Sequence, residues 1–260
     1  MKTWKTIAVA CLIVLVGCNK QGTISGDTFT QNKLSGNETK ETFNAPDHKV
    51  NPFDHLGQIH NEGLAAIHRY KAETGDTTRK GKASFLEKWY HERTGIAVNV
   101  TAYPRIEPAI MQDYRKVLDN LMESPEGKGY MTLLCNTLEA TKEVTPTAYN
   151  RLLKNIILIE QKIVSSALGK YENDVLLHVS TMMRHSAHYW SNYLNNPEIT
   201  KKQQDKVVTN FLRKLAGLIA GVGADASALA WHYAKNSPYD VMVGESIMMS
   251  EICGYYTGWW

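Results

Sequence analysis

The sequence lacks a marked excess of charge of either sign. Its 29 lysine and arginine residues stand against 26 aspartate and glutamate residues, a formal net charge of +3. Two of the lysines, Lys2 and Lys5, lie within residues 1–17, so the remainder carries 27 basic against 26 acidic residues, or +1. Proteins that bind nucleic acid concentrate basic charge, and segments that bind anionic lipid carry polybasic runs. Neither feature is present, so we expect no nucleic-acid partner.

Cysteine is also scarce, and no Cys-x-x-Cys spacing occurs. The four cysteines are Cys11, Cys18, Cys135 and Cys253. Without paired spacing, neither a zinc site nor a thioredoxin-like redox motif is supported. Cys11 and Cys18 belong to the N-terminal segment, which leaves Cys135 and Cys253 for the folded part. Outside the cytoplasm these two either form a disulfide or remain as buried thiols, and the sequence leaves both alternatives open.

The motifs of the best-defined catalytic sites are missing as well. The chain contains no Ser-His-Asp order, no phosphate-cradling glycine loop, no nucleotide fingerprint and no His-Glu-x-x-His. These absences remove the hydrolase, nucleotide-binding and zinc-protease classes that such motifs define. We therefore expect no cofactor.

The N-terminus, by contrast, has a clear organisation. Lys2 and Lys5 form a positive head, an apolar run extends from Ile7 to Val16, and Gly17 precedes Cys18. This is the pattern of an export signal, because the apolar run is too short for a permanent membrane span. A small residue directly before Cys18 resembles the lipobox of bacterial lipoproteins. That resemblance implies cleavage of a signal peptide comprising residues 1–17, acylation of Cys18, and attachment to a membrane through this lipid.

The residue after the cysteine bears on the destination of the lipoprotein. Asn19 follows Cys18, so this position is not occupied by an aspartate. By resemblance to lipoprotein sorting rules, this favours the outer membrane. No acidic run follows that would suggest surface display, so we expect the periplasmic face. The implied partners are the membrane and a candidate envelope protein.

The remaining chain divides into a tether and a domain. Residues 18–50 comprise the lipidated cysteine and a stretch rich in Thr, Asn, Gly, Lys and Gln, with few large apolar residues. Such a composition cannot bury enough surface to fold alone. From residue 51 to residue 260 the pattern becomes helical, and this length is sufficient for one domain with a sizeable core.

Helical periodicity, together with capping residues and prolines at the expected helix starts, predicts an all-α fold of eight or nine helices. Capping residues directly precede proline at Asn51-Pro52, Ser124-Pro125, Thr145-Pro146 and Ser237-Pro238. The expected helices are 52–74, 82–93, 106–122, 126–143, 146–168, 171–194, 200–220, 222–235 and 238–253. Only residues 96–103 alternate like a strand, and one short strand has no partner.

The first helix of the domain contains two candidate functional residues. A step of about 100° per residue places His60 in the middle of an apolar stripe that runs from Leu56 to Ile67. A buried histidine requires a hydrogen-bond partner, and Gly57 and Gly63 would allow a neighbouring helix to approach and supply one. His60 is therefore either a satisfied core residue or a catalytic one. Asp54 is either a residue of the helix start or an acid or base.

The same helix carries a family resemblance. Residues 51–64 match Asn-Pro-[Phe/Tyr]-Asp-x-x-Gly-x-x-His-Asn-x-x-Leu without departure. This pattern, after a lipoprotein signal and tether, resembles the opening of a group of uncharacterised Bacteroidota lipoproteins. The resemblance covers about fourteen residues and implies the class of the protein but no activity.

A second group of histidines lies on the helix expected at 171–194. His178, His185 and His188 lie along one border of its apolar stripe, where they could offer two or three nitrogens to a metal. No acidic residue shares that border. The alternative is that these histidines are structural residues of an amphipathic core helix.

Residues 215–231 are rich in small residues. A membrane span of this length, interrupted by Asp225, would be short and costly. The pattern instead predicts a buried helical hairpin that bends at residues 221–223. Asp225 then either caps the second helix or is a buried acid that needs a partner, and His232 is a candidate member of the same site.

Two functional hypotheses follow. The first is a non-enzymatic binding or scaffolding role through helix grooves and the four aromatic residues of the C-terminal tail, 254–260. The second is a hydrolase or metal site built from His60, Asp54, His178, His185 and Asp225. The first is favoured, because the histidines lack the acidic context and spacing of catalytic motifs.

Overall fold

The structure is a computed structural model that describes residues 42–95, 97, 107–196 and 207–257. The chain divides into two compact units, Met1–Lys40 and Glu41–Trp260, and the described residues all belong to the second. The signal peptide, Cys18 and residues 19–41 of the tether lie outside the described residues. So do residues 98–103 of the strand-like stretch and residues 258–260 of the aromatic tail.

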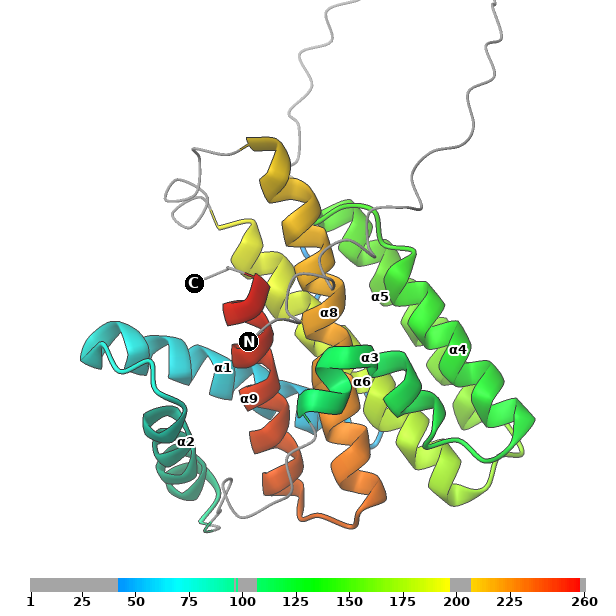
Figure 1. The fold of residues 1–260 in the computed structure, drawn as a ribbon. Coiled ribbons are helices and arrows are strands. Elements are labelled where there is room, and N and C mark those ends of the chain that lie inside the picture. Colours follow the sequence, from blue (N-terminus) through cyan, green and yellow to red (C-terminus); the bar gives the residue numbers. More distant parts are fainter. Residues whose placement is uncertain (1–41, 96, 98–106, 197–206, 258–260) are drawn as a thin grey trace, which may run out of the picture. The chain divides into compact units, whose positions relative to one another are not determined.

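The described residues form eight helices and no strand, which confirms the all-α prediction (Figure 1). The helices are α1 (Asp54–Thr74), α2 (Arg79–Thr94), α3 (Glu107–Asp119), α4 (Pro125–Glu139), α5 (Pro146–Val164), α6 (Lys170–Leu194), α8 (Val207–Ala234) and α9 (Tyr239–Thr257). Among these eight, no helix is both long enough and apolar enough to cross a membrane.

Two of the predicted helix starts are confirmed in detail. The Ser124 side chain accepts a hydrogen bond from the Gly127 N–H at the start of α4, and Thr145 accepts one from the Ala148 N–H at the start of α5. The predicted cap at Asn51 is wrong, because α1 begins at Asp54. The Asn51 side-chain oxygen accepts from the Phe53 N–H, directly before the helix, and its amide group donates to buried Glu160, 2.7 Å away.

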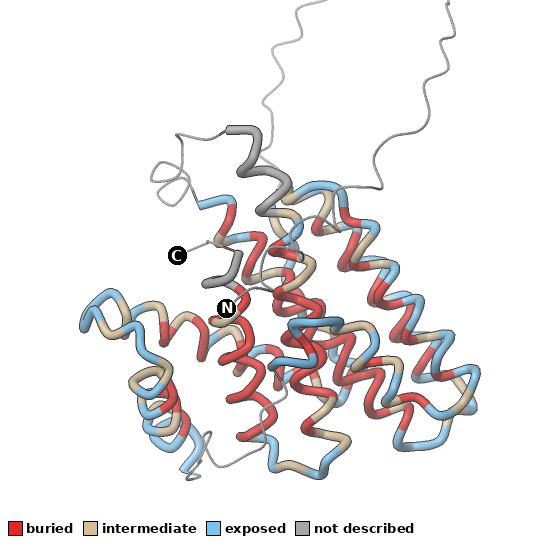
Figure 2. Tube along the Cα trace, in the orientation of Figure 1, coloured by how far each residue is buried: buried red, intermediate tan, exposed pale blue. Residues whose placement is uncertain are grey.

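Helix α6 forms the centre of the domain. Every residue from Asp174 to Ala187 is buried, and α6 packs against α1, α4, α5 and α8 (Figure 2). A helix that is buried on all sides belongs to the interior of its protein. The predicted amphipathic border is therefore wrong for His178 and His185, which are enclosed together with the apolar stripe, whereas His188 is half-buried.

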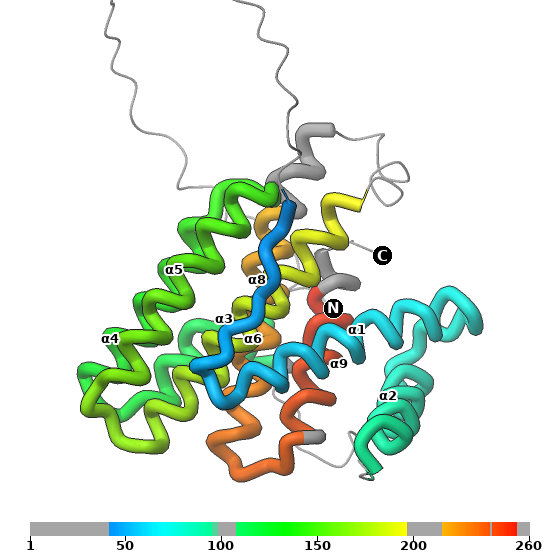
Figure 3. Tube along the Cα trace, turned by 180° about the vertical axis from the view of Figure 1, so that it is seen from behind, coloured from blue at the N-terminus to red at the C-terminus, as the bar shows by residue number. Residues whose placement is uncertain are grey.

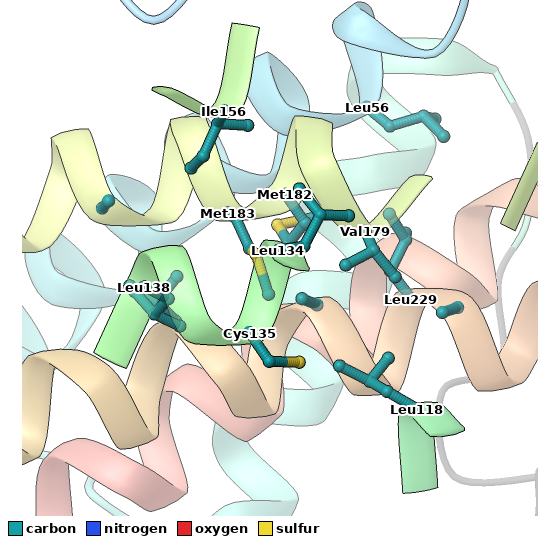
Figure 4. Close-up of a cluster of buried hydrophobic side chains, with 14 of the residues drawn as sticks. Leu56, Leu118, Leu134, Cys135, Leu138, Ile156, Val179, Met182, Met183 and Leu229 are labelled. Atoms are coloured by element: carbon teal, nitrogen blue, oxygen red, sulfur yellow. The ribbon is translucent and has the colours of Figure 1, made fainter. Parts of the chain in front are cut away.

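The apolar core surrounds α6. Side chains from all eight described helices contribute to it, and the close-up in Figure 4 shows part of it. They include Leu56, Leu118, Leu134, Leu138, Ile156, Val179, Met182, Met183 and Leu229. Cys135 lies in the same core, and both Cys135 and Cys253 are buried free thiols, which decides the alternative left open by the sequence.

The predicted hairpin at residues 221–223 is wrong, because α8 is one continuous helix from Val207 to Ala234. The small residues serve close packing instead of a bend. A Cβ atom added at Gly223 would lie 2.8 Å from the ring of Tyr114 on α3, so only glycine permits this approach. Asp225 consequently lies inside a helix and does not cap one.

Residues 42–50, which the sequence analysis assigned to the tether, pack on the domain. We call this extended segment the N-terminal strap (Figure 3). The Phe43 ring lies 5.7 Å from that of Tyr149, the His48 Nδ1 atom lies 2.6 Å from Glu160 Oε2, and Arg184 donates to the carbonyl oxygen of Pro46. The folded unit thus begins near residue 42 and not at residue 51.

This boundary predicts a difference in stability between two shortened chains. A chain that begins at Asn51 should lose at least about 2 kcal/mol of unfolding free energy relative to one that begins at Thr42, because it lacks the strap's contacts with Glu160 and Arg184. Urea unfolding of both chains measures the difference. Equal midpoints would mean that the strap contributes nothing to the fold.

Candidate functional site

The structure brings Asp54 and His185 together in a buried polar cluster on α6. We call Asp54, Glu160, Arg184 and His185 the Asp54 cluster. Arg184 lies between the two acids, with its NH2 group 2.7 Å from Asp54 Oδ1 and its Nε atom 3.1 Å from Glu160 Oε2. His185 Nε2 lies 3.1 Å from the same Asp54 oxygen. One arginine thus bridges two carboxylates, from α1 and α5.

The acceptor oxygens of this cluster already have protein donors. Glu160 accepts hydrogen bonds from Asn51 and Ser180, each at 2.7 Å, in addition to the His48 and Arg184 contacts. The other oxygen of Asp54 accepts from the backbone N–H of His48 at 3.1 Å. A buried network whose acceptor oxygens are paired in this way rigidifies a core. Its geometry is that of a structural element.

The pKa of Asp54 supports this interpretation. Burial alone raises the pKa, but the hydrogen bond from His185 and the charge of Arg184 outweigh it and hold the pKa of Asp54 well below its usual range. The carboxylate therefore stays ionised near neutral pH. A general acid or base needs a pKa close to the working pH, which Asp54 does not have.

Among the described residues, the side chains placed closely enough to bind a metal ion together differ from those predicted. Ligand atoms of Asp47, Asp54 and His185 lie within 4.8 Å of one another, and no other such group occurs in the described ranges. His178 stacks 3.8 Å from the ring of Phe53, and the His188 ring lies 5.5 Å from that of Tyr149, so the predicted His178, His185 and His188 set does not converge. A cation at Asp54 would have to displace the Arg184 guanidinium, which already supplies positive charge there.

His60 and Asp225 meet in a second buried cluster. We call His60, Ser186, Asp225 and Ser250 the Asp225 cluster. His60 Nε2 lies 3.5 Å from Asp225 Oδ2, which also accepts hydrogen bonds from Ser186, at 2.5 Å, and from Ser250. All four residues are fully buried. Ser250 Oγ also lies 3.4 Å from His60 Nε2. Both serine hydroxyls contact the carboxylate and are fully buried, so neither is open to a substrate.

Burial shifts the two titratable groups of this cluster in opposite directions. It raises the pKa of Asp225 to about 7, against the hydrogen bonds from Ser186, Ser250 and Trp190. It lowers the pKa of His60 to about 4, against hydrogen bonds to Asn61 and Ser246. His60 is therefore uncharged near neutral pH, and burial favours the protonated form of the acid beside it. His232, the other candidate, lies elsewhere, with its Nδ1 atom 3.0 Å from Ser237 Oγ.

The two glycines of α1 allow these clusters to form, as the sequence predicted. A Cβ atom at Gly57 would lie 2.4 Å from the His185 imidazole, whereas the nearest atom to one at Gly63 would be the terminal Cδ1 atom of Ile247, at 2.3 Å, followed by Trp89 Cζ3 at 3.3 Å. The imidazole is fixed by Asp54, but the end of an isoleucine side chain can rotate away. The two positions should therefore respond differently to the same added methyl group.

We expect Gly57→Ala to destabilise the protein by about 1–3 kcal/mol through overpacking against His185. Gly63→Ala is the matched control, and we expect it to change stability by less than about 1 kcal/mol. The higher helix propensity of alanine offsets the cost of moving the end of the Ile247 side chain. Thermal melts of both variants test the contrast. A loss at Gly63 as large as that at Gly57 would contradict it.

A third buried group, the Glu251 clamp, was missed by the sequence analysis. The Glu251 carboxylate on α9 is fully buried and lies 3.1 Å from His68, 3.1 Å from Lys71 and 3.0 Å from Lys82. Burial raises its pKa, but the His68 hydrogen bond and the two lysine charges prevail and hold the pKa at about 2. Three acids, Asp240, Glu245 and Glu251, lie within the apolar run of α9, and nothing in the sequence distinguishes Glu251 from the other two. The clamp ties α1, α2 and α9 together.

An open groove of about 430 Å³ lies between α1 and α2. Its lining residues are Glu62, Ala65, Arg69, Trp89, Glu92 and Arg93. The sequence does not mark these residues as a site, because charged residues on two surface helices resemble an ordinary solvated face. We call this feature the α1–α2 groove. In contrast to the buried clusters, it presents its polar groups to solvent.

The sequence candidates thus lie in the interior, whereas the groove lies at the surface on residues outside the predicted set. Asp54 and His185 form one cluster, His60 and Asp225 form another, and His178 and His188 belong to neither. Comparison of the chain with protein-family models, curated proteins and solved structures finds no match.

Proposed function

We propose that the protein is a non-enzymatic binding protein of the bacterial envelope that uses the α1–α2 groove as its binding site. The lipobox-like Leu15–Cys18 stretch supports attachment through a lipid on Cys18, and Asn19 supports an outer-membrane location facing the periplasm. The near-neutral charge of the chain after residue 17 argues against nucleic acid as a partner.

The observation that carries this proposal is the groove itself. It combines an indole ring with guanidinium and carboxylate groups at a solvent-exposed surface, which is the chemistry of a ligand site. The histidines and acids that would suggest catalysis are instead buried and bound to one another. A reaction at these groups would first require access for a substrate.

A hydrolytic or metal-dependent activity is the second candidate, and one observation favours it. Asp47, Asp54 and His185 hold three potential ligand atoms close together, and Asp47 is exposed. This function requires Arg184 to leave Asp54. It therefore predicts that Asp54→Asn abolishes activity or zinc uptake, whereas the binding function predicts only a loss of stability.

A ligand screen by thermal shift separates the two functions. The panel contains neutral disaccharides, acidic disaccharides, amino acids and dipeptides, tested on wild-type protein, Ala65→Phe and Asp54→Asn. We expect a compound that raises the melting temperature of the wild type and of Asp54→Asn but not of Ala65→Phe, whose phenyl ring fills the groove. Cleavage of any compound, lost in Asp54→Asn, would overturn the proposal.

The lipid anchor is tested separately. Cys18→Ser should abolish the incorporation of labelled fatty acid and release the protein from the membrane fraction. Equal membrane retention of this variant, with no label in the wild type, would refute the anchor while leaving the groove unaffected.

A further inference from the structure

The groove residues follow helical spacing on two facing helices. Glu62, Ala65 and Arg69 lie at positions i, i+3 and i+7 of α1, and Trp89, Glu92 and Arg93 lie at i, i+3 and i+4 of α2. Such spacing places each set on one face of its helix. The alanine is the smallest side chain in the lining. Its methyl group leaves the open space that a larger residue would fill.

The two walls of the groove are held in a fixed geometry. Lys71 of α1 and Lys82 of α2 both bind the buried Glu251 carboxylate. The rings of Tyr70 and Phe85 stack with centroids 4.6 Å apart at an interplanar angle of 17°. The Thr78 side chain caps α2. A site whose walls are positioned before a ligand arrives avoids part of the entropic cost of binding.

The charges of the groove cancel, with two arginines against two glutamates. Arg93 NH2 lies 2.6 Å from Glu62 Oε2, so one pair is already formed across the helices. Arg69 forms no hydrogen bond or ion pair with any other described residue. The two carboxylates would repel a polyanion, and the two guanidinium groups would repel a polycation. The lining therefore disfavours ligands of high charge and presents donors and acceptors together.

These features point to a polyhydroxylated ligand, and we infer that the α1–α2 groove binds an uncharged pyranose disaccharide. The inference rests on the proposed binding function and deepens it. The Trp89 indole offers a flat apolar surface to the C–H face of a sugar ring. The planar guanidinium of Arg69 donates two parallel hydrogen bonds, which suit adjacent ring hydroxyls, and the glutamates accept hydroxyl protons. The volume of about 430 Å³ falls within the range of small-molecule sites.

The test is a titration of cellobiose and of N,N′-diacetylchitobiose into the purified domain, followed by calorimetry and by tryptophan fluorescence. We expect saturable binding that Trp89→Ala and Ala65→Phe each weaken at least tenfold. Trp231→Phe is the matched control, because this tryptophan lies on α8 and lines no part of the groove. The affinity for an uncharged ligand should change less than twofold between 50 and 500 mM salt, since screening acts on charge–charge attraction.

The other outcomes separate this inference from the function on which it rests. Stronger, salt-sensitive binding of digalacturonate would overturn the uncharged class but keep the groove as a binding site. Binding of a dipeptide from the screen, with no response to either neutral disaccharide, would overturn the saccharide assignment alone. Equal behaviour of wild type and Ala65→Phe toward every compound would overturn both.

Discussion

Replacing Arg184 with methionine should lower the free energy of unfolding by about 3–5 kcal/mol, because it leaves two buried carboxylates without their cation. The Arg184 and Glu160 side chains are fully buried, and Asp54 is nearly so. Arg184 also donates to the Pro46 carbonyl oxygen, so the strap loses an attachment in the same variant. Urea denaturation followed by circular dichroism measures the loss.

Two further variants make this result specific. Lys170→Met breaks the Lys170–Asp174 ion pair, whose lysine is 86% exposed, and should leave the urea midpoint nearly unchanged. Combining Arg184→Met with Asp54→Asn and Glu160→Gln removes the two unpaired carboxylate charges and should restore part of the stability. If Arg184→Met behaves like Lys170→Met, the Asp54 cluster is not the structural element described above.

The stability contribution of Asp225 should depend on pH in a direction opposite to that of an ordinary surface carboxylate. Its pKa rises from 3.8 to about 7 on folding. The raised pKa favours the protonated form, so the contribution is fully present below pH 3.8 and is lost as the pH rises through about 7. The difference corresponds to about 4 kcal/mol. Asp225→Asn keeps a neutral side chain, so its stability relative to wild type should increase by about 3–4 kcal/mol from pH 4 to pH 8.

His60 provides the opposite case in the same cluster. Its pKa falls from 6.5 to about 4 on folding, so its contribution is present above pH 6.5 and is lost as the pH falls toward 4. His60→Gln should therefore gain stability relative to wild type, by about 3 kcal/mol, as the pH falls from 7 to 4. Unfolding free energies of the three proteins at several pH values give both differences. If the unfolding free energies of wild type and Asp225→Asn changed in parallel with pH, the raised pKa of buried Asp225 would be contradicted.

The fold class and several helix boundaries were predictable because they depend on local signals. The Ser124-Pro125 and Thr145-Pro146 pairs mark helix starts through short-range capping, which the structure retains. The small-residue run at 215–231 was ambiguous, since glycine permits both a bend and a close helix contact. Tyr114 decides between these at Gly223, and it lies more than a hundred residues away in sequence.

The candidate site was predictable only in part, for the same reason. His60 was correctly placed on a buried stripe, but its proximity to Asp225 depends on how α1, α8 and α9 pack together. Likewise, Asp54 and His185 are separated by 131 positions, and no local pattern indicates their contact. The groove was missed because its chemistry becomes apparent only when the two helix faces are opposed, with Ala65 and Trp89 lining the same space.

The central claim is that the buried charges hold the fold and the α1–α2 groove binds the ligand. The most direct test is the affinity for cellobiose of Asp54→Asn and Ala65→Phe, measured by calorimetry under conditions in which both variants are folded. We expect Asp54→Asn to be less stable than wild type but to bind equally well. We expect Ala65→Phe to be as stable as wild type but to bind at least tenfold more weakly. Loss of binding in Asp54→Asn, with normal binding in Ala65→Phe, would contradict it.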